Sequence, residues 1–591
     1  MGRFSPCGGD RPDLIQEIKM KTLDLFHEAA SDVGSTTALV SVRLESAEDR
    51  ARRIVSDIMK ARHICVGAFS AGKDSSVLAS VILLTGAELK TQGYEVPPIV
   101  IVHSQTGIEN PVVARLALAE LKKMELFAQR HQLDLRVLLG YPDLNDSFPV
   151  RVIGGRALPA FASSRPDCST DLKVKVNTKL LNQLMRSAPN LGDWKAPVVM
   201  TGVRQNESAA RDKRIEERQE SAEGMWVNDQ GHLRASPILL HTVDDVWEHL
   251  GMCAAGVYDS YSDFSDTMEL YKAAGGSSCV IVADMKMSGS SKPCGARTGC
   301  WACTRIGPHD RSAEQMIDSD LVRYGFMKPL NRLRNWIANT QYDWSMRQFV
   351  GRSIASDGYI EIGADTYSPD TLKKLLVYTL TAERKSGVQI ISIQQLFAID
   401  ARWSLYAIAP PFSALKIYLD LQNNDGWEEA PVVPVFPKTD VPKVGRIHVG
   451  DDWYKVTGIK SAVGLRDVGL EMYADSCNVG LKSLSNGALV CDYEEADAFS
   501  VDAVGAADFL EFLAEDYIAS YCDPSCSDWT YGFKTYLRMG TISLATGQSR
   551  MTDEILRRSQ WRQEHELHGQ RAWLDLEHRC DQLHTAQIAL L

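Results

Sequence analysis

The stretch Ser70-Ala71-Gly72-Lys73-Asp74-Ser75-Ser76 decides the fold because of the residues that flank it. An apolar run from His63 to Phe69 precedes it, and a second apolar run from Val77 to Leu84 follows it. This order predicts a buried strand, a tight polar loop and a helix. At such a junction several backbone N–H groups and the positive end of the helix point at one place, which suits an anion.

The side chains of this loop indicate a phosphate site. Gly72 lets the backbone approach a phosphate closely, and Lys73 adds a positive charge. Hydroxyl donors come from Ser70, Ser75 and Ser76. The spacing G-x-x-x-x-G-K-[ST] is absent, which excludes a Walker A loop. An ordinary strand-to-helix turn is the alternative to a phosphate-binding loop.

Strand-like and helix-like segments alternate from residue 51 to about residue 250. Further strands are expected at 97–103, 133–139 and 197–202, and a helix at 114–132. Nearly continuous apolar strands that alternate with helices predict a doubly wound parallel sheet covered on both faces. Ligands of such sheets bind at the carboxyl ends of the strands, where the loop at Ser70 lies.

Three more polar segments follow strand candidates or a Pro/Gly-rich loop, at 103–111, 168–173 and 202–211. If the fold is α/β, these segments meet the loop at Ser70. Basic residues also gather between Arg151 and Lys179 and between Arg204 and Arg214. Judged by charge alone, both basic groups are more typical of a solvated face than of a binding groove.

Taken in chain order, these motifs resemble the superfamily of PP-loop ATP pyrophosphatases and phosphoadenylylsulfate (PAPS) reductases. The loop matches S-x-G-x-D-S, residues 106–111 match T-G-x-E-x-P, and residues 202–211 match G-x-R-x-x-E-S-x-x-R. Residues 168–173 match C-T-x-x-x-K except that Ser169 replaces threonine. Residues 236–250 resemble the closing element of the family, where Asp244 or Asp245 is expected to cap or begin a helix.

The resemblance implies that ATP and Mg²⁺ occupy this site. It assigns nucleotide binding to Ser70, Ala71, Gly72, Lys73, Asp74, Ser75, Ser76, Glu109, Gly202, Arg204, Glu207 and Arg211. Lys73 and Arg204 would stabilise phosphate charge, and Asp74 would help to hold the metal.

Four cysteines, Cys279, Cys294, Cys300 and Cys303, lie within 25 residues. Four clustered thiols indicate a metal site, with zinc and a [4Fe–4S] cluster as the candidates. A single C-x-x-C pair in an irregular set favours iron–sulfur over a zinc ribbon. Unliganded loop cysteines are the alternative.

This cysteine segment also carries the closest family resemblance. C-G-x-x-x-G-C-W-x-C-T, at residues 294–304, resembles the sulfur-insertion subunit of bacterial DNA phosphorothioation systems, which serve in defence. The resemblance makes the four cysteines cluster ligands, Cys279 being the least secure, and Cys168 a sulfur carrier or substrate-site residue. It implies DNA, a cysteine desulfurase and other subunits of the modification complex as partners.

Two other functions compete with this one. A sulfonucleotide (PAPS or APS) reductase or a tRNA-thiolation enzyme would share the fold. A reductase needs a reactive C-terminal cysteine in an E-C-G-x-H segment. Cys580 lacks this context. At i, i+4 from His584, it fits a helix surface better than a reactive site. A nucleotide-sensing scaffold without catalysis is the third possibility.

Length and composition set the remaining limits. A chain of 591 residues predicts about three or four domains. The expected division is an N-terminal helical segment at 1–50, the α/β domain at 51–250, a Cys-rich segment at 251–330 and accessory regions at 331–425 and 426–591. A net charge of −12 argues against a nonspecific nucleic-acid coat but permits a local basic groove. The sequence has no apolar run of membrane-spanning length and no signal-peptide core, and its cysteines do not indicate a disulfide framework. A cytoplasmic location is therefore expected.

Beyond residue 330 the sequence predicts helices and strands but shows no second catalytic motif. Helices are expected at 331–350, from Ser368 onward, near 507–521 and at 552–585, with an extended linker at 425–443 and a strand at 445–449.

Overall fold

The structure is a computed structural model that describes most of the chain from residue 45 onward. The described residues are 45–161, 167–205, 207, 209–228, 231–275, 299–354, 359–423, 426–440, 447–448, 481–483, 489–491, 499–545 and 547–564. The chain divides into two units, Met1–Ser46 and Ala47–Leu591. The predicted helical segment 1–50 therefore lies almost wholly outside the described residues, and the boundaries proposed for the other domains stay predictions.

A six-stranded sheet confirms the α/β class. Its strand order is β3 (Leu135–Gly140), β2 (Ile99–Ser104), β1 (His63–Phe69), β4 (Lys195–Met200), β6 (Leu233–Ala235) and β5 (Trp226–Val227). The pairs are parallel except β5 with β6. The chain winds outward from β1 in one direction and from β4 in the other. The switch point, where ligands of such sheets bind, therefore lies between β1 and β4.

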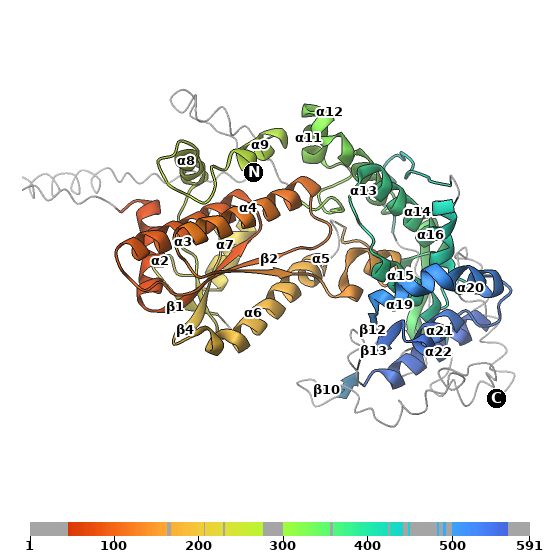
Figure 1. Cartoon of the computed structure of the whole chain (residues 1–591). Coiled ribbons are helices and arrows are strands. Elements are labelled where there is room, and N and C mark those ends of the chain that lie inside the picture. Colours follow the sequence, from red (N-terminus) through yellow and green to blue (C-terminus); the bar gives the residue numbers. More distant parts are fainter. Residues whose placement is uncertain are drawn as a thin grey trace, which may run out of the picture. The chain divides into compact units, whose positions relative to one another are not determined.

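Both faces of the sheet are covered, as the sequence predicts. Alternate residues of a strand point to opposite faces. Cys65, Phe69, Ile101 and Met200 pack in a core with helices α2, α3 and α4, whereas Val66, Val102 and Val199 pack against Leu181 and Leu184 of α6. Figure 1 shows α3 and α4 on one side of β1 and β2 and α6 on the other.

The helices of this part connect and flank the strands. Their bounds are α2 (Ala47–Lys60), α3 (Lys73–Thr91), α4 (Pro111–Arg130), α5 (Asp167–Ser169), α6 (Lys175–Ser187), α7 (Ala209–Glu217), α8 (Val243–Ala254) and α9 (Ser265–Ala273). The predicted cap of α8 is displaced by a few residues. Thr242 is the N-cap, and Asp245 completes a capping box with it.

Later residues form helices and short strand pairs. The helices are α11 (Arg311–Ser319), α12 (Leu321–Tyr324), α13 (Lys328–Asn339), α14 (Pro369–Ser386), α15 (Ile393–Leu405), α16 (Ser413–Asn423), α19 (Ala503–Phe512), α20 (Ala514–Tyr521), α21 (Tyr531–Met539) and α22 (Ser549–Glu564). The strands are β7 (Arg347–Ile354), β8 (Tyr359–Tyr367), β9 (Ile447–His448), β10 (Leu481–Ser483), β11 (Leu489–Cys491), β12 (Phe499–Val501) and β13 (Ile542–Leu544). Among the helices of the described residues, none has the length and apolarity to cross a membrane.

The predicted helix 331–350 is wrong in its second half. Helix α13 ends at Asn339, and residues from Arg347 onward form β7, because β7 pairs antiparallel with β8. Strand pairing thus overrides the helical pattern of the local sequence. The helix after Ser368 is confirmed, with Ser368 as N-cap and a proline in the first turn. The predicted 507–521 helix is two helices, α19 and α20, and residues 565–585 lie outside the described part.

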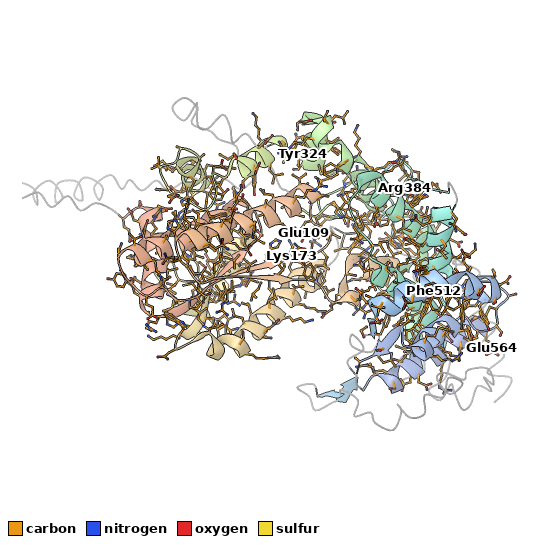
Figure 2. All side chains as sticks on the ribbon, viewed as in Figure 1. Glu109, Lys173, Tyr324, Arg384, Phe512 and Glu564 are labelled. Carbon is orange, nitrogen blue, oxygen red and sulfur yellow. The ribbon has the colours of Figure 1, made fainter. Side chains whose placement is uncertain are left out.

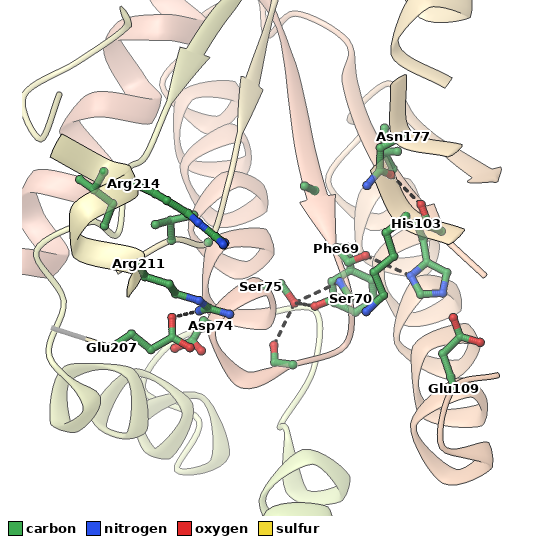
Figure 3. Close-up of a pocket in the computed structure, with 18 of the residues that line it drawn as sticks. Phe69, Ser70, Asp74, Ser75, His103, Glu109, Asn177, Glu207, Arg211 and Arg214 are labelled. Carbon is green, nitrogen blue, oxygen red and sulfur yellow. Dashed lines mark hydrogen bonds and ion pairs between the residues drawn. The ribbon is translucent and has the colours of Figure 1, made fainter. Parts of the chain in front are cut away.

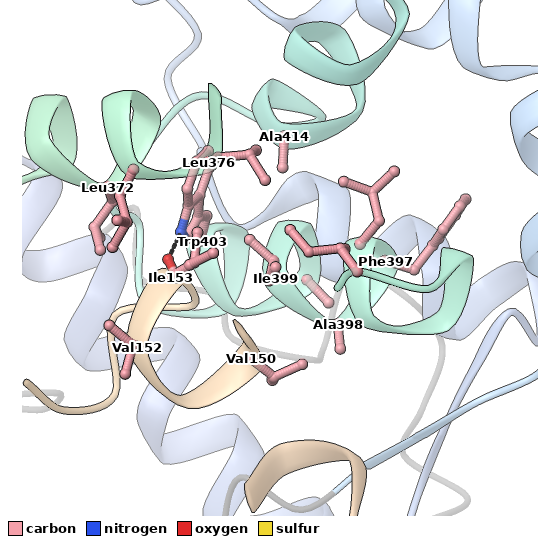
Figure 4. Close-up of a cluster of buried hydrophobic side chains, with 14 of the residues drawn as sticks. Val150, Val152, Ile153, Leu372, Leu376, Phe397, Ala398, Ile399, Trp403 and Ala414 are labelled. Atoms are coloured by element: carbon pink, nitrogen blue, oxygen red, sulfur yellow. Dashed lines mark hydrogen bonds between the residues drawn. The ribbon is translucent and has the colours of Figure 1, made fainter. Parts of the chain in front are cut away.

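A second core joins the end of the sheet region to the later helices. The π-helical turn η3 (Pro149–Ile153) buries Val150, Val152 and Ile153 against α14 and α15, as Figure 4 shows. The indole Nε1 of Trp403 donates a hydrogen bond to the Ile153 carbonyl oxygen at 2.7 Å. The segment after β3 therefore belongs to the same core as residues more than 200 positions later.

Candidate functional site

The loop Ser70–Ser76 joins the carboxyl end of β1 to the first turn of α3, as predicted. Ser75 closes the loop: its Oγ donates to the Gly72 carbonyl at 2.9 Å and accepts from the Ser70 N–H at 3.1 Å. Ala71 has a φ of 56°, in the left-handed region that residues with a Cβ seldom adopt. The loop is thus held in one tight conformation by its own side chains.

Gly202, at the end of β4, lies directly against this loop. A Cβ on Gly202 would lie 3.1 Å from the backbone carbon and oxygen of Asp74 and 3.2 Å from the Cα of Ser75. Only a glycine lets the loop after β4 approach the loop after β1 this closely. The two loops at the switch point therefore form one surface.

The predicted charged residues pair with one another at this surface. Asp74 Oδ1 accepts a hydrogen bond from Arg204 Nε at 2.6 Å, and Asp74 Oδ2 lies 3.2 Å from Lys73 Nζ. Arg204 is 2% exposed. Both oxygens of Asp74 thus face cations, so the role of Asp74 as a metal ligand stays a prediction.

A pocket of about 480 Å³ opens beside the loop. Of the predicted nucleotide residues, those that line it are Ser70, Gly72, Asp74, Ser75, Glu109, Gly202, Glu207 and Arg211, whereas Ala71, Lys73, Ser76 and Arg204 do not. Figure 3 shows Glu207, Arg211 and Arg214 on one side, His103, Glu109 and Asn177 on the other, and Ser70 and Ser75 between them.

Other lining residues lie outside the predicted nucleotide-binding set. They are His103 and Lys173, which belong to two of the predicted polar segments, and Asn177, Arg214 and Arg218. His103 Nδ1 lies 3.0 Å from the Phe69 carbonyl, and Ser104 Oγ donates to Asn177 Oδ1 at 2.6 Å. Arg214 and Arg218 follow Arg211 at helical spacing, and this spacing can be seen in the sequence. Judged by charge alone, the basic group that includes Arg214 was expected on a solvated face.

A second cavity of about 370 Å³ brings three cysteines together. Cys168, Cys300 and Cys303 all line it, and so does Lys173, which also lines the first pocket. Lys173 therefore stands in the wall between the two cavities. Figure 2 labels Lys173 and Glu109 next to each other in this region.

The cysteine loop is fixed to the loop after β2 by backbone hydrogen bonds. The Trp301 N–H donates to the Ile108 carbonyl at 2.8 Å, and the Asn110 N–H donates to the Gly299 carbonyl at 3.2 Å. Arg334, which is fully buried, donates from Nε to the Cys303 carbonyl at 2.8 Å and also bonds the Gly307 carbonyl. The thiol-bearing loop thus takes its position from both the sheet region and α13.

Burial raises the pKa of two of these thiols. Burial is the largest effect on Cys300 and raises its pKa to about 11. The charge of Lys173 lowers this pKa, and the charge of Glu109 raises it. Burial and then the neighbouring Cys303 raise the pKa of Cys168. Since the thiolate is the nucleophile and the metal ligand, these thiols need a cation, a metal or a base to become reactive.

The predicted metal ligands are only partly within the described residues. Cys279 and Cys294 lie outside them, as does Cys580. Within the described part of the chain, no group of three or more His, Cys, Asp and Glu side chains is arranged to hold a metal ion. The donor chemistry of Cys300 and Cys303, two thiols on one cavity, is compatible with an iron–sulfur cluster.

Comparison with known proteins gives weak similarities. No family model matches the chain, and no curated protein matches it in sequence. A PAPS reductase from Candida auris, solved with phosphate, is 13% identical with a TM-score of 0.21, over 38% of this chain and 84% of that one. An FMN adenylyltransferase from Candida glabrata, solved with FAD and pyrophosphate, is 14% identical with a TM-score of 0.21, over 36% of this chain and 62% of that one.

Proposed function

We propose that this chain is an ATP pyrophosphatase and sulfurtransferase that splits ATP into AMP and pyrophosphate and uses the energy to place sulfur in a DNA backbone phosphate. The loop after β1 offers backbone N–H groups, hydroxyls and the start of α3 to the phosphates. Lys73 and Arg204 supply positive charge for the leaving pyrophosphate, and Mg²⁺ bound with ATP would neutralise the rest.

The proposed reaction balances in two steps. An oxygen of a DNA phosphate attacks the α-phosphorus of ATP and pyrophosphate leaves, which joins AMP to the DNA phosphate. Hydrosulfide, or a persulfide together with two electrons from a thiol, then attacks the DNA phosphorus. A phosphorus–sulfur bond forms, the phosphorus–oxygen bond breaks, and AMP departs with the former DNA oxygen.

The observation that carries this proposal is the wall shared by the two cavities. Lys173 lines both the pocket beside the loop Ser70–Ser76 and the cavity with Cys168, Cys300 and Cys303. A phosphate that is activated in the first would thus lie close to sulfur that is held in the second. The positive charge of Lys173 favours the thiolate form of Cys300 and suits anionic groups on either side.

A [4Fe–4S] cluster on Cys279, Cys294, Cys300 and Cys303 is the second part of the proposal. When bound, it would supply sulfide or electrons beside the cavity. Cys168, on the same cavity, is the proposed sulfur carrier. A cysteine desulfurase would deliver the sulfur, and the other subunits of a bacterial phosphorothioation defence system would be the partners.

ATP turnover by the anaerobically purified full-length chain, supplied with DNA and a sulfur donor, tests the reaction. We expect AMP and pyrophosphate from the wild type and a fall of about 100-fold or more in Lys73→Ala. Lys90→Ala, on the exposed far end of the same helix, is the matched control and should keep wild-type rates. Formation of ADP, or equal loss in both variants, would contradict the proposal.

The same preparation separates the competing activities. Consumption of PAPS with release of sulfite would identify a sulfonucleotide reductase, and sulfur found in tRNA rather than DNA would identify a tRNA-thiolation enzyme. Nucleotide binding without any turnover would identify a scaffold. Each of these results would replace the proposed function.

Iron and sulfide content tests the cluster. Cys303→Ser should lose most of the iron and the associated visible absorbance, whereas Cys526→Ser, a free cysteine elsewhere in the described chain, should keep both. Wild-type protein without iron, or with zinc in its place, would contradict the cluster assignment.

A further inference from the structure

Helix α7 presents a row of arginines to the pocket beside the loop Ser70–Ser76. Arg211, Arg214 and Ile215 belong to α7, and Arg218 follows its last residue, Glu217, with its N–H still bonded to the Arg214 carbonyl at 3.1 Å. The four residues have the spacing i, i+3, i+4 and i+7 of one helical face, and all four line the pocket. Ile215 is 5% exposed and fixes the helix to the protein. The arginines are exposed at the rim, where Figure 3 shows Arg211 and Arg214 extending toward the pocket.

The arginines of this row differ in their existing partners. Arg211 pairs with Glu207. Arg218 lies 3.3 Å from Glu220, a buried carboxylate that also accepts a hydrogen bond from Ser236 Oγ. The side chain of Arg214 is exposed, and its guanidinium makes no ion pair or hydrogen bond with any residue that the structure describes, whereas its backbone carbonyl accepts from the Arg218 N–H at 3.1 Å.

The side chains that line the pocket include more cations than carboxylates. Its cations are Lys173, Arg211, Arg214 and Arg218, and its carboxylates are Asp74, Glu109 and Glu207. Asp74 is already paired with Arg204 and Lys73, and Glu109 accepts a hydrogen bond from the Thr106 N–H at 2.5 Å. In a chain with a net charge of −12, a surplus of cations at one rim needs an anionic partner.

We propose that the arginine face of α7, centred on Arg214, binds consecutive phosphates of the DNA strand that the site modifies. The inference rests on the proposed function and adds to it the surface that holds the acceptor. A single nucleotide places its phosphates on the loop at the base of the pocket, whereas a row one helical turn apart along the rim matches an extended chain of phosphates. Guanidinium groups suit this task because their planar donors bind phosphate oxygens in pairs.

The position of the row fits the chemistry. The reacting DNA phosphate must reach the α-phosphate of a nucleotide on the loop, so the strand has to cross the open side of this pocket. Contacts to phosphates fix the position of a strand without reading its bases. The row therefore binds and orients the acceptor, and base preference is left to other residues or partners.

Fluorescence anisotropy with a labelled single-stranded DNA oligonucleotide tests the proposal on the full-length chain without ATP. Arg214→Ala should weaken binding about tenfold at low salt and reduce the slope of log K against log salt by about 0.7. Arg214→Lys, which keeps the charge, should recover most of the affinity. Lys213→Ala is the matched control, because Lys213 is 77% exposed on another face of α7 and pairs with Glu217.

ATP binding is measured on the same variants, so that the two sites are told apart. Unchanged ATP affinity in Arg214→Ala, together with weaker DNA binding, supports the proposal. Loss of ATP affinity with unchanged DNA binding would assign Arg214 to the nucleotide and overturn it. Equal effects of Arg214→Ala and Lys213→Ala, no DNA binding by the wild type, or much tighter binding of RNA would also overturn it, while formation of AMP would still report on the proposed function.

Discussion

At the residue scale, the site depends on how closely two backbone loops approach each other. A Cβ on Gly202 would lie 3.1–3.2 Å from backbone atoms of Asp74 and Ser75, which is closer than ordinary van der Waals contact, and Ser75 in turn closes its own loop. Asp74 lines the pocket and pairs with the buried Arg204. Small changes of shape here should therefore alter nucleotide binding more than stability.

Gly202→Ala is the first prediction at this scale. The added Cβ would meet backbone atoms of the loop at 3.1–3.2 Å, and backbone cannot swing away as a flexible side chain can. We expect ATP affinity to fall about tenfold, measured by equilibrium binding. Gly251→Ala, where a Cβ meets nothing within 4 Å, is the control. Equal affinity in the two variants would show that the loop adjusts freely.

Asp74→Asn is the second prediction. It removes the charge partner of the buried Arg204 guanidinium, and an uncompensated buried charge is costly. The free energy of unfolding in urea should fall by about 2 kcal/mol. Asp57→Asn, in an exposed pair 3.9 Å from Arg53, should change it by less than about 0.5 kcal/mol. A neutral Asp74→Asn would mean that Arg204 finds another partner.

The site residues that follow a recognisable strand or match a motif could be predicted from the sequence. The loop Ser70–Ser76 and Gly202 each follow a strand, and they line one pocket. Lys173 and Cys168 could not be placed beside Cys300, because that contact joins segments more than 120 residues apart through tertiary packing. The sequence assigns Arg214 to a solvated face, because charge without a known helix face is uninformative.

At the element scale, helices α2, α3 and α8 are joined by one buried polar contact. His249 Nδ1 lies 3.0 Å from Glu48 Oε2, and His249 Nε2 lies 2.9 Å from Ser80 Oγ. Burial opposes the charged form of His249, but its contacts with Cys253 and Glu48 raise its pKa to about 9. Burial likewise opposes the charge on Glu48, yet contacts with His241 and His249 hold the pKa of Glu48 well below its usual value.

The pH dependence of stability follows from these shifts and is the third prediction. A raised histidine pKa stabilises the fold fully below about pH 6.5, and this contribution is lost as the pH rises through about 9. The Glu48 contribution is present above its unfolded pKa and is lost on acidification. Between pH 6.5 and 9.5 the wild type should lose on the order of 2 kcal/mol of unfolding free energy.

His249→Gln should flatten that decline, whereas His131→Gln, on a partly exposed histidine near Asp259, should leave it in place. Urea unfolding across the pH range makes the comparison. The same decline in wild type and His249→Gln would rule out this contact as its source.

Helices and strands could be predicted where a local sequence pattern marks them. The prediction failed where pairing with a distant strand determines the secondary structure. The four main strands and α14 were expected within a few residues, because apolar runs and caps mark them. The predicted helix 331–350 includes the first residues of β7, because only pairing with β8 makes this segment a strand.

At the scale of the whole molecule, the segment after β3 is built into the core of the later helices. Asn145 Nδ2 donates to the Phe499 carbonyl at 3.0 Å, and Trp403 reaches the Ile153 carbonyl. The cysteine loop is held between the loop after β2 and Arg334 of α13. The thiol cavity therefore depends on both the sheet region and the later helices of the unit Ala47–Leu591.

Trp403→Phe is the fourth prediction. It removes a buried hydrogen bond and leaves a small cavity, so unfolding free energy should fall by about 2–3 kcal/mol. Trp344→Phe loses a similar 2.8 Å bond to Thr439 Oγ1 at an exposed site and should cost well under 1 kcal/mol. A neutral Trp403→Phe would indicate that η3 is not integral to the second core.

If the nucleotide pocket and the thiol cavity act as one site, as we propose, one reaction yields two products in fixed proportion. The full-length chain, purified without oxygen, is incubated with ATP, DNA, cysteine and a cysteine desulfurase, and AMP and DNA-bound sulfur are quantified together. We expect equal amounts of AMP and DNA phosphorothioate, both lost in Lys73→Ala. AMP without sulfur in DNA, or sulfur transfer that needs no ATP, would contradict it.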